Sequence, residues 1–486
     1  MANNQQPAKS VNPLHTSARE GAASNSSSMV PLLPYSTEEI RGALALFIRQ
    51  AAYQPAKFLS SAARLAADQI DILGGNSEYE LPANSRFDDP RWKERGFQRR
   101  LLHAWLSLDQ RSHELLEALE LDTLDERRIE FLLKQISSGL SPANFVVCNP
   151  EVNDRTLTTR GKNLIQGLGR LWRDFRDNSG LPTQVDKDLF KVGENLAVTP
   201  GNVIYRNEVF ELIQYTPATT EVHRTPLLLV PSFINRGYIF DLKPGRSLVE
   251  NMLAKGHSVF LVMWNNPGVE HRHLGIDDYV QSVLTAGEAV RDVSRSGKFN
   301  LTGICGGAQL VALAAAVLQG RRKRWVNTLT LISFVVDPQP EDTDPGALCT
   351  EAVVKLAKRQ VRKQQLYKAS SLNWTMNLLQ PDRLLWATGV DYYLLGKDPS
   401  ASEVMYWMNH QVNVAEKMYC DEIDIMFNNP LPEPGKLEVL GVPIDLGKLK
   451  VDNYHLAPYY DHVMPWHSIY RNHGFFGGNS EIVVTN

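Results

Sequence analysis

The apolar residues in the first part of the chain recur at the three- and four-residue spacing of amphipathic helices. The pattern is clearest in EEIRGALALFIRQAAY (38–53), FQRRLLHAWLSLDQRSHELLEAL (97–119) and GKNLIQGLGRLWRDFRD (161–177). It predicts a mainly helical N-terminal domain of four or more helices over residues 34–200. Residues 1–33 are rich in Asn, Gln, Ser and Ala, so we expect them to form a disordered arm.

After residue 200 the spacing changes from helical to strand-like. The segment VIYRNEVFELIQYTP (203–217) alternates like an antiparallel hairpin. Short apolar runs rich in β-branched residues follow at 225–234, 257–264, 298–305 and 326–336, separated by segments long enough for helices. Continuous apolar strands that alternate with helices predict an α/β fold with a mostly parallel sheet covered by helices on both faces.

A helical, Trp- and Tyr-rich segment at about 340–440 interrupts this alternation. The strand-helix pattern resumes with a strand at 451–458, a helix near 466–475 and a last strand, SEIVVTN (480–486). Long insertions between sheet strands are usually functional covers. We therefore predict that residues 201–486 form one catalytic domain with an inserted lid.

Composition narrows the class of protein. The chain has 486 residues, a formal net charge of -3 and 43% hydrophobic residues, which gives no reason to expect nucleic acid as a partner. The four cysteines are scattered without a C-x-x-C pair, which favours reduced thiols. We find no signal peptide and no apolar run long enough to cross a bilayer, so we expect a cytoplasmic protein.

The stretch FNLTGICGGAQL (299–310) carries the strongest chemical signal. G-x-[SC]-x-G between a strand and a helix is the nucleophile elbow of the α/β-hydrolase fold, a sharp turn that leaves no room for bulky neighbours. It predicts Cys305 as the nucleophile and the backbone N–H of Gly306 as an oxyanion donor. The helix N-terminus should also favour the thiolate, which is the attacking form. The competing interpretation is a buried cysteine beside a glycine-rich packing turn. Cys148, Cys349 and Cys420 lie in helical or linker sequence without such a turn, and we expect each to be an inert small apolar residue.

In this fold the acid and then the histidine follow the nucleophile along the chain. Asp461 lies between a strand and a helix in YHLAPYYDHVMPW and is the predicted acid, although a helix N-cap would look the same. The histidine is expected after the last strand, where this sequence ends at Asn486. His462, His467 and His473 are the candidates for a substitute base, and His462 adjoins the acid.

Other chemistry has little support in the sequence. By analogy with hydrolases, the second oxyanion donor should come from the loop after the first parallel strand, near Phe233 or Ile234. His271-x-His273 has the composition of a metal site, but a solvated loop pair is the simpler interpretation. No Gly-x-Gly-x-x-Gly or P-loop follows a strand. We expect neither a metal nor a cofactor.

Together these stretches resemble the bacterial polyhydroxyalkanoate synthases over nearly the whole chain after the N-terminal arm. The resemblance is carried by RFDDPRW (86–92), SPANFVVCNPE (141–151), residues 190–215, PSFINRGYIFDL (231–242), GICGG (303–307), YYLLG (392–396), FNNPL (427–431) and DHVMPW (461–466). The elbow alone is shared with other hydrolases, whereas the whole set in this order is specific.

The resemblance implies a cytoplasmic enzyme that polymerises 3-hydroxyacyl-CoA into polyester and releases CoA. It implies acylation of Cys305 and a catalytic role for Asp461, which opens the family's Asp-His-x-x-Pro-Trp motif. The family's histidine lies in a Ser-Gly-His stretch beyond the last strand, which this sequence does not contain. The partners implied are the substrate, the growing polyester, the polyester granule surface and a second copy of the chain in a homodimer.

Two stretches depart from the family's usual pattern. Trp264-Asn265-Asn266-Pro267 lacks the arginine of a Trp-Arg-Asn-Pro loop, and Trp407-Met408-Asn409-His410 replaces a Trp-Asn-x-Asp pattern. Two further hypotheses therefore stand beside a working synthase. One is a catalytically impaired homologue that binds granules or an active partner subunit, and the other is a cysteine-type thioesterase or esterase. The sequence does not decide the chain length of the monomer.

Overall fold

The computed structural model describes residues 37–82 and 85–486, so the arm expected at residues 1–33 lies outside the described residues. At its centre is an eight-stranded sheet in the order β1-β2-β6-β3-β7-β8-β13-β14. The strands are β1 (Gly201–Arg206), β2 (Phe210–Tyr215), β3 (Leu227–Val230), β6 (Val259–Trp264), β7 (Phe299–Ile304), β8 (Val326–Ile332), β13 (Asp452–Pro458) and β14 (Ser480–Thr485). β2 runs antiparallel to both neighbours, whereas every pair from β6 to β14 is parallel. The predicted hairpin and the predicted mostly parallel sheet are confirmed.

Both faces of the sheet are buried, because side chains alternate along each strand between two cores. In β6, Phe260 and Val262 face a core shared with the helices α8 (Ile276–Ser294) and α9 (Gly306–Gly320). Their neighbour Leu261 faces a second core, shared with α7 (Leu248–Ala254). This explains why the strands read as continuous apolar runs. α15 (Trp466–Tyr470) and a short hairpin of β4 (Asp241–Lys243) with β5 (Arg246–Ser247) complete this part of the molecule.

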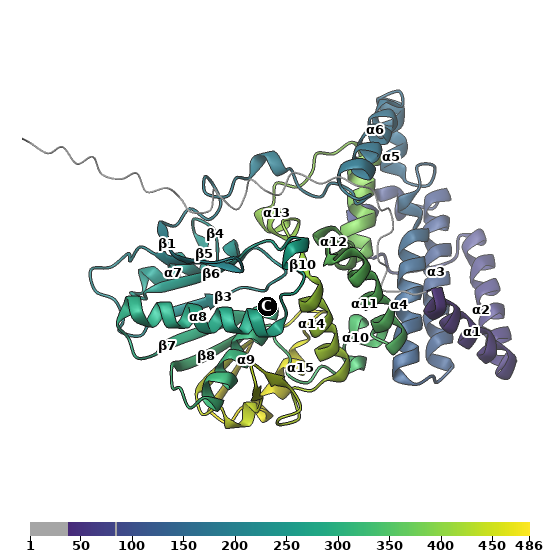
Figure 1. Ribbon diagram of the computed structural model, residues 1–486. Helices are drawn as coiled ribbons and strands as arrows, with labels where there is room; N and C mark the ends of the chain where they lie inside the picture. Colours follow the sequence, from purple (N-terminus) through teal and green to yellow (C-terminus); the bar gives the residue numbers. More distant parts are fainter. Residues whose placement is uncertain (1–36, 83–84) are drawn as a thin grey trace, which may run out of the picture.

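Within the described residues, six α-helices precede the sheet in sequence and lie away from it at one side of the molecule (Figure 1). They are α1 (Thr37–Tyr53), α2 (Pro55–Gly74), α3 (Phe97–Ala118), α4 (Thr123–Leu140), α5 (Pro150–Thr158) and α6 (Lys162–Asp177). The helical N-terminal region is therefore confirmed. Proline at the first turn of α2 and of α5 suits a position whose N–H has no helical acceptor.

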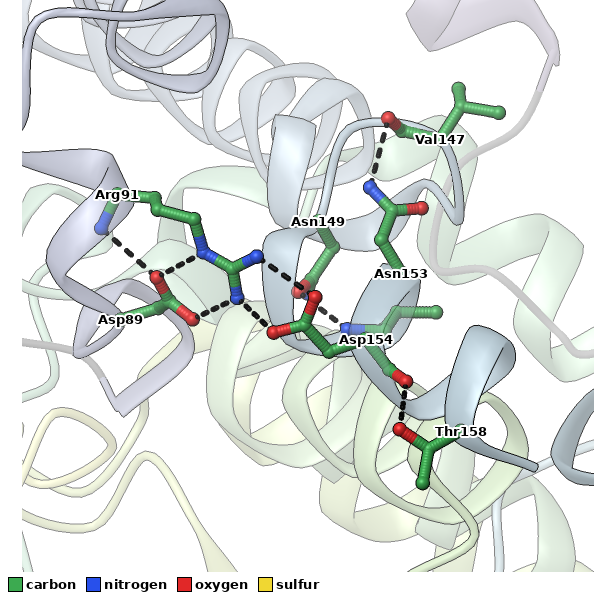
Figure 2. A network of polar contacts seen from close by, with 8 residues as sticks. Asp89, Arg91, Val147, Asn149, Asn153, Asp154 and Thr158 are labelled. Carbon is green, nitrogen blue, oxygen red and sulfur yellow. Dashed lines mark hydrogen bonds and ion pairs between the residues drawn. The ribbon is translucent and has the colours of Figure 1, made fainter.

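A network of polar contacts connects the segment before α3 to α5 (Figure 2). The guanidinium of Arg91 donates to both carboxylate oxygens of Asp89, at 2.9 and 2.6 Å, and to both oxygens of Asp154 on α5, at 3.0 and 2.7 Å. The same contact to Arg91 holds the pKa of the Asp89 carboxyl below its usual range. Arg91 therefore ties the segment before α3 to α5.

The insertion (residues 340–440) lies in sequence between β8 and β13 and in space between the N-terminal helices and the sheet (Figure 1). It contains α10 (Asp344–Leu348), α11 (Glu351–Gln364), α12 (Ala369–Leu379), α13 (Glu403–Met408) and α14 (Glu416–Asn428). Two π-helical turns, Pro381–Ala387 and Val390–Leu395, follow α12. β9 (Leu366–Tyr367) pairs antiparallel with the distant β10 (Val414–Ala415), and a small hairpin of β11 (Glu438–Val439) with β12 (Val442–Pro443) follows at the end of the insertion.

The N-terminal helices hold the insertion through its backbone carbonyl groups. Gln135 on α4 donates to the carbonyl of Leu378 at 3.0 Å, and Asn163 on α6 donates to that of Leu394 at 2.7 Å. A Cβ placed on Gly167 of α6 would lie 1.7 Å from a backbone oxygen of the insertion, so only glycine permits this approach. The insertion is thus supported on the side that faces away from the sheet.

Candidate active site

Cys305 lies on a strained turn that joins β7 directly to α9. Its φ of +53° and ψ of −126° are unfavourable for a residue with a side chain. A Cβ on Gly303 would lie 2.5 Å from the carbonyl oxygen of Gly307, and one on Gly307 would lie 2.4 Å from the carbonyl oxygens of Val230 and Pro231 in β3 and the loop after it. The glycines are needed because two backbone segments cross here without space for a methyl group. Cys305, in its strained conformation, is the residue whose side chain this turn presents for reaction.

Hydrogen bonds and burial have opposite effects on the pKa of the Cys305 thiol. The backbone N–H of Gly306 bonds to the Cys305 sulfur, and the nearby hydroxyl of Ser232 acts in the same direction, each lowering the pKa of the thiol. Burial is the largest effect and raises that pKa above its ordinary value. The N–H at the start of α9 thus lowers the pKa of the thiol, but burial outweighs it and the net shift is upward.

Asp461 follows β13 and lies near the elbow. Its Oδ1 accepts hydrogen bonds from the backbone N–H groups of Val463 and Met464, both at 2.9 Å, which closes the turn before α15. Its negative charge raises the pKa of the Cys305 thiol. Two residues that are 156 positions apart in the sequence are thus brought within electrostatic reach of each other.

The three candidate histidines occupy different surroundings. His462 is exposed, and its Nδ1 lies 3.2 Å from the side-chain nitrogen of Gln380 in the insertion. His467 lies 3.7 Å from the carboxylate of Asp342, and the Nδ1 of His473 lies 2.8 Å from a backbone carbonyl of its own turn. The side-chain charges with the largest effect on the pKa of the Cys305 thiol belong to carboxyl groups and not to these histidines.

The loop after β3, which contains Ile234, is held by the two stretches that depart from the family pattern. The indole N–H of Trp264 donates to the carbonyl of Pro231 at 2.9 Å. That of Trp407 donates to the carbonyl of Arg236 at 2.7 Å. The carbonyl of Ile234 itself accepts from a backbone N–H of the insertion at 3.2 Å. Both tryptophans thus position the loop that we expect to supply the second oxyanion donor.

Comparison with known proteins identifies the family. Residues 83–252 match the family model described as "Poly-beta-hydroxybutyrate polymerase (PhaC) N-terminus". The chain is 36% identical over 417 residues to Poly(3-hydroxyalkanoate) polymerase 2 of Ectopseudomonas oleovorans, which covers 85% of this chain and 74% of that protein. It is 32% identical over 466 residues to polymerase 1 of the same organism, covering 96% and 83%. This chain belongs to the poly(3-hydroxyalkanoate) polymerase family.

The α/β-hydrolase core predicted from the elbow is also confirmed for this polymerase-family chain. The elbow connects a central parallel strand to a helix buried against the sheet, as that fold requires. Among solved structures, alpha/beta hydrolase domain-containing protein 10 from mouse covers 59% of this chain and 88% of its own, at 13% identity with a TM-score of 0.33.

The structure places one acidic group near the Cys305 thiol that the sequence did not indicate. Glu422 on α14 accepts a hydrogen bond from the side-chain amide of Gln309 at 2.8 Å. Burial, and to a smaller extent the charge of Asp421, raise the pKa of Glu422 to about 7. The negative charge of Glu422 in turn raises the pKa of the Cys305 thiol. In the sequence nothing separates Glu422 from the neighbouring acids of α14.

Residues 37–82 and 85–486 were expected to hold no metal and no membrane span. No group of three or more His, Cys, Asp or Glu side chains there has the arrangement of a metal site. His271 and His273 each bond to the backbone of their own turn, through Gly268 and Glu270. Within the same residues, no helix combines the length and apolar character that a membrane span needs.

Proposed function

We propose that this chain is a poly(3-hydroxyalkanoate) polymerase, an acyltransferase that joins 3-hydroxyacyl groups from CoA thioesters into polyester and releases CoA. The observation that carries the proposal is Cys305 on its glycine-lined elbow, in a chain that belongs to this family. A thiol nucleophile suits the reaction, because exchanging one thioester for another preserves the reactivity of the acyl group.

The geometry supports a two-step reaction. In the first step the Cys305 thiol loses its proton and its sulfur attacks the thioester carbon; the bond from that carbon to the CoA sulfur breaks, and the CoA sulfur takes up the proton that the thiol lost. The N–H of Gly306 lies at the elbow and is assigned to the oxyanion, together with the N–H of Ile234. In the second step the 3-hydroxyl oxygen of another unit attacks the acyl group on Cys305, loses its proton and releases the sulfur. We assign Asp461 to the support of that proton transfer.

The insertion is assigned the role of a cover that limits water at Cys305. Hydrolysis of the acyl-enzyme would end the polyester chain, so excluding water preserves its growth. The contacts of Trp407 with the loop after β3 and of Glu422 with Gln309 both join the insertion to the elbow. We expect no cofactor, since the thioester itself supplies the activated acyl group.

An assay with the purified chain tests the proposal. We would follow CoA release from a 3-hydroxyacyl-CoA and extract polyester from the same mixture, for the wild type, Cys305→Ala and Cys148→Ala. The expected result is CoA release with polyester in the wild type and in Cys148→Ala, and neither in Cys305→Ala. CoA release with only monomeric acid would instead indicate a thioesterase. An acylated Cys305 without turnover would indicate an impaired homologue.

We also propose a cytoplasmic location at the polyester granule and a homodimeric state. The support for granule binding is an exposed apolar stripe on α6, formed by Ile165, Leu168 and Trp172, whose side chains are 74%, 68% and 73% exposed. These residues lie at i, i+3 and i+7, so they share one face of the helix. Replacing all three with serine should reduce sedimentation with isolated granules, and unchanged sedimentation would refute this assignment. Light scattering of the full chain tests the dimer.

A further inference from the structure

A carboxyl group from the insertion is bound to the same helix end that presents the nucleophile. The Nε2 of Gln309 donates to the Oε2 of Glu422 at 2.8 Å, and Gln309 is only 7% exposed. Gln309 lies one turn after Cys305 on α9, and its backbone N–H bonds to the Cys305 carbonyl at 3.2 Å. Glu422 is therefore fixed relative to the elbow through a short chain of hydrogen bonds.

The basic groups near α14 neutralise other acids. Lys417 binds Asp421 at 2.6 Å, and Lys358 on α11 pairs with Asp424. Within the described part of the chain, the partner of Glu422 is an amide and no ion pair involves it. The elements that contact α14 carry further ionisable groups, which include Arg362 on α11, Asp278 on α8 and Tyr367 on β9.

Two carboxyl groups therefore oppose the ionisation of the Cys305 thiol at this site. The charges of Asp461 and Glu422 both raise the pKa of the Cys305 thiol. Asp461 is held in its turn by two backbone N–H groups. Glu422 receives one neutral amide hydrogen bond, and burial raises its pKa to about 7.

We propose that Glu422 and Cys305 oppose each other's ionisation across the Gln309 contact, so that a thiolate at Cys305 favours the protonated form of Glu422. This inference rests on the proposed function for its place in turnover. Once Cys305 is acylated its sulfur is neutral and Glu422 is free to ionise. When the next hydroxyl attacks and the thiolate is released, the proton lost by that hydroxyl balances the protonation of Glu422. Glu422 is thus a positioning residue, which acts on the reaction through the ionisation of Cys305.

Alkylation of Cys305 by iodoacetamide tests the inference without any hydroxyacyl substrate. We would measure the rate by mass spectrometry of the Cys305 peptide, from about pH 6 to about pH 10, in the wild type, Glu422→Gln and Asp424→Asn. Glutamine can still bond to Gln309 but carries no charge. The midpoint for Glu422→Gln should move to lower pH by about one unit, the size expected for one charge acting across several ångströms of protein interior. Asp424→Asn removes an acid from the same helix and should leave the midpoint unchanged.

A midpoint in Glu422→Gln that coincides with the wild type, or that moves to higher pH, would overturn the inference. Gln309→Leu provides a second test that leaves Glu422 in place. The amide of Gln309 lowers the pKa of Glu422, so its loss should keep Glu422 protonated to higher pH and speed alkylation near neutral pH. An unchanged rate there would also contradict the inference. A wild type that releases no CoA would refute the proposed function but would leave these profiles unaffected.

Discussion

Replacing Gly307 with alanine tests the close crossing at the elbow. The added Cβ would lie 2.4 Å from two backbone carbonyl oxygens, those of Val230 and Pro231, whereas real Cβ atoms essentially never come within 3.0 Å of another heavy atom. The backbone would therefore have to move by about 0.6 Å, and neither contact can relax by rotating a side chain. Overpacking of this kind costs about 1–3 kcal/mol. Alanine gains up to about 1 kcal/mol over glycine inside a helix.

Because both contacts of Gly307 are with backbone atoms, we expect the upper part of that range and a net loss of about 2 kcal/mol in the free energy of unfolding. Urea unfolding would measure it, and iodoacetamide alkylation would report displacement of Cys305. Gly169 on α6 is the matched control, since a Cβ there meets nothing within 4 Å. Gly169→Ala should stabilise the chain by up to about 1 kcal/mol. If both variants shift unfolding equally and leave alkylation unchanged, the crowding argument is refuted.

Three further changes test other parts of the molecule. Asp461→Asn should move alkylation of Cys305 to lower pH and still abolish polymer formation, and a midpoint unmoved from that of the wild type would contradict the assigned charge effect. Asp382→Ala removes the ion-pair partner of the buried Arg86, which keeps its bond to Asn144, and should cost about 2 kcal/mol in urea unfolding, with faster proteolysis of the insertion; equal digestion rates would argue against it. Burial lowers the pKa of His455 to about 4, so the unfolded chain binds its proton first, and stability present above about pH 6.5 should fall by up to about 3 kcal/mol towards pH 4. His455→Gln should flatten that dependence, which parallel urea curves for the two proteins would disprove.

The local features of the fold could be predicted from sequence because they depend on local periodicity. The run FLVMW in β6 had to be buried on both faces, and the structure divides it between two cores. The elbow could be recognised in the sequence because the backbone is so crowded at positions 303 and 307 that only glycine fits there. Such signals need only neighbours in the chain.

The pairing of distant segments could not be predicted in the same way. Glu422 sits in EKMYCDEIDIMFN, where Asp421, Asp424 and the first-turn glutamate look equally suited to solvent. Only the packing of α14 over α9 selects Glu422, through Gln309. The net shift in the pKa of the Cys305 thiol could not be predicted either, because the effect of the Gly306 N–H is local in sequence whereas burial depends on the folded structure.

The contacts between the N-terminal helices and the insertion also affect the order in which the chain can fold during synthesis. Gln135 and Asn163 bind carbonyl groups that lie 243 and 231 residues further along the chain. At about 5–20 residues per second, these helices leave the ribosome about 10–50 s before their partners exist. The surfaces of α4 and α6 that will hold the insertion stay uncovered for that time. The N-terminal helices therefore reach their final packing only after both the elbow and the insertion have been synthesised.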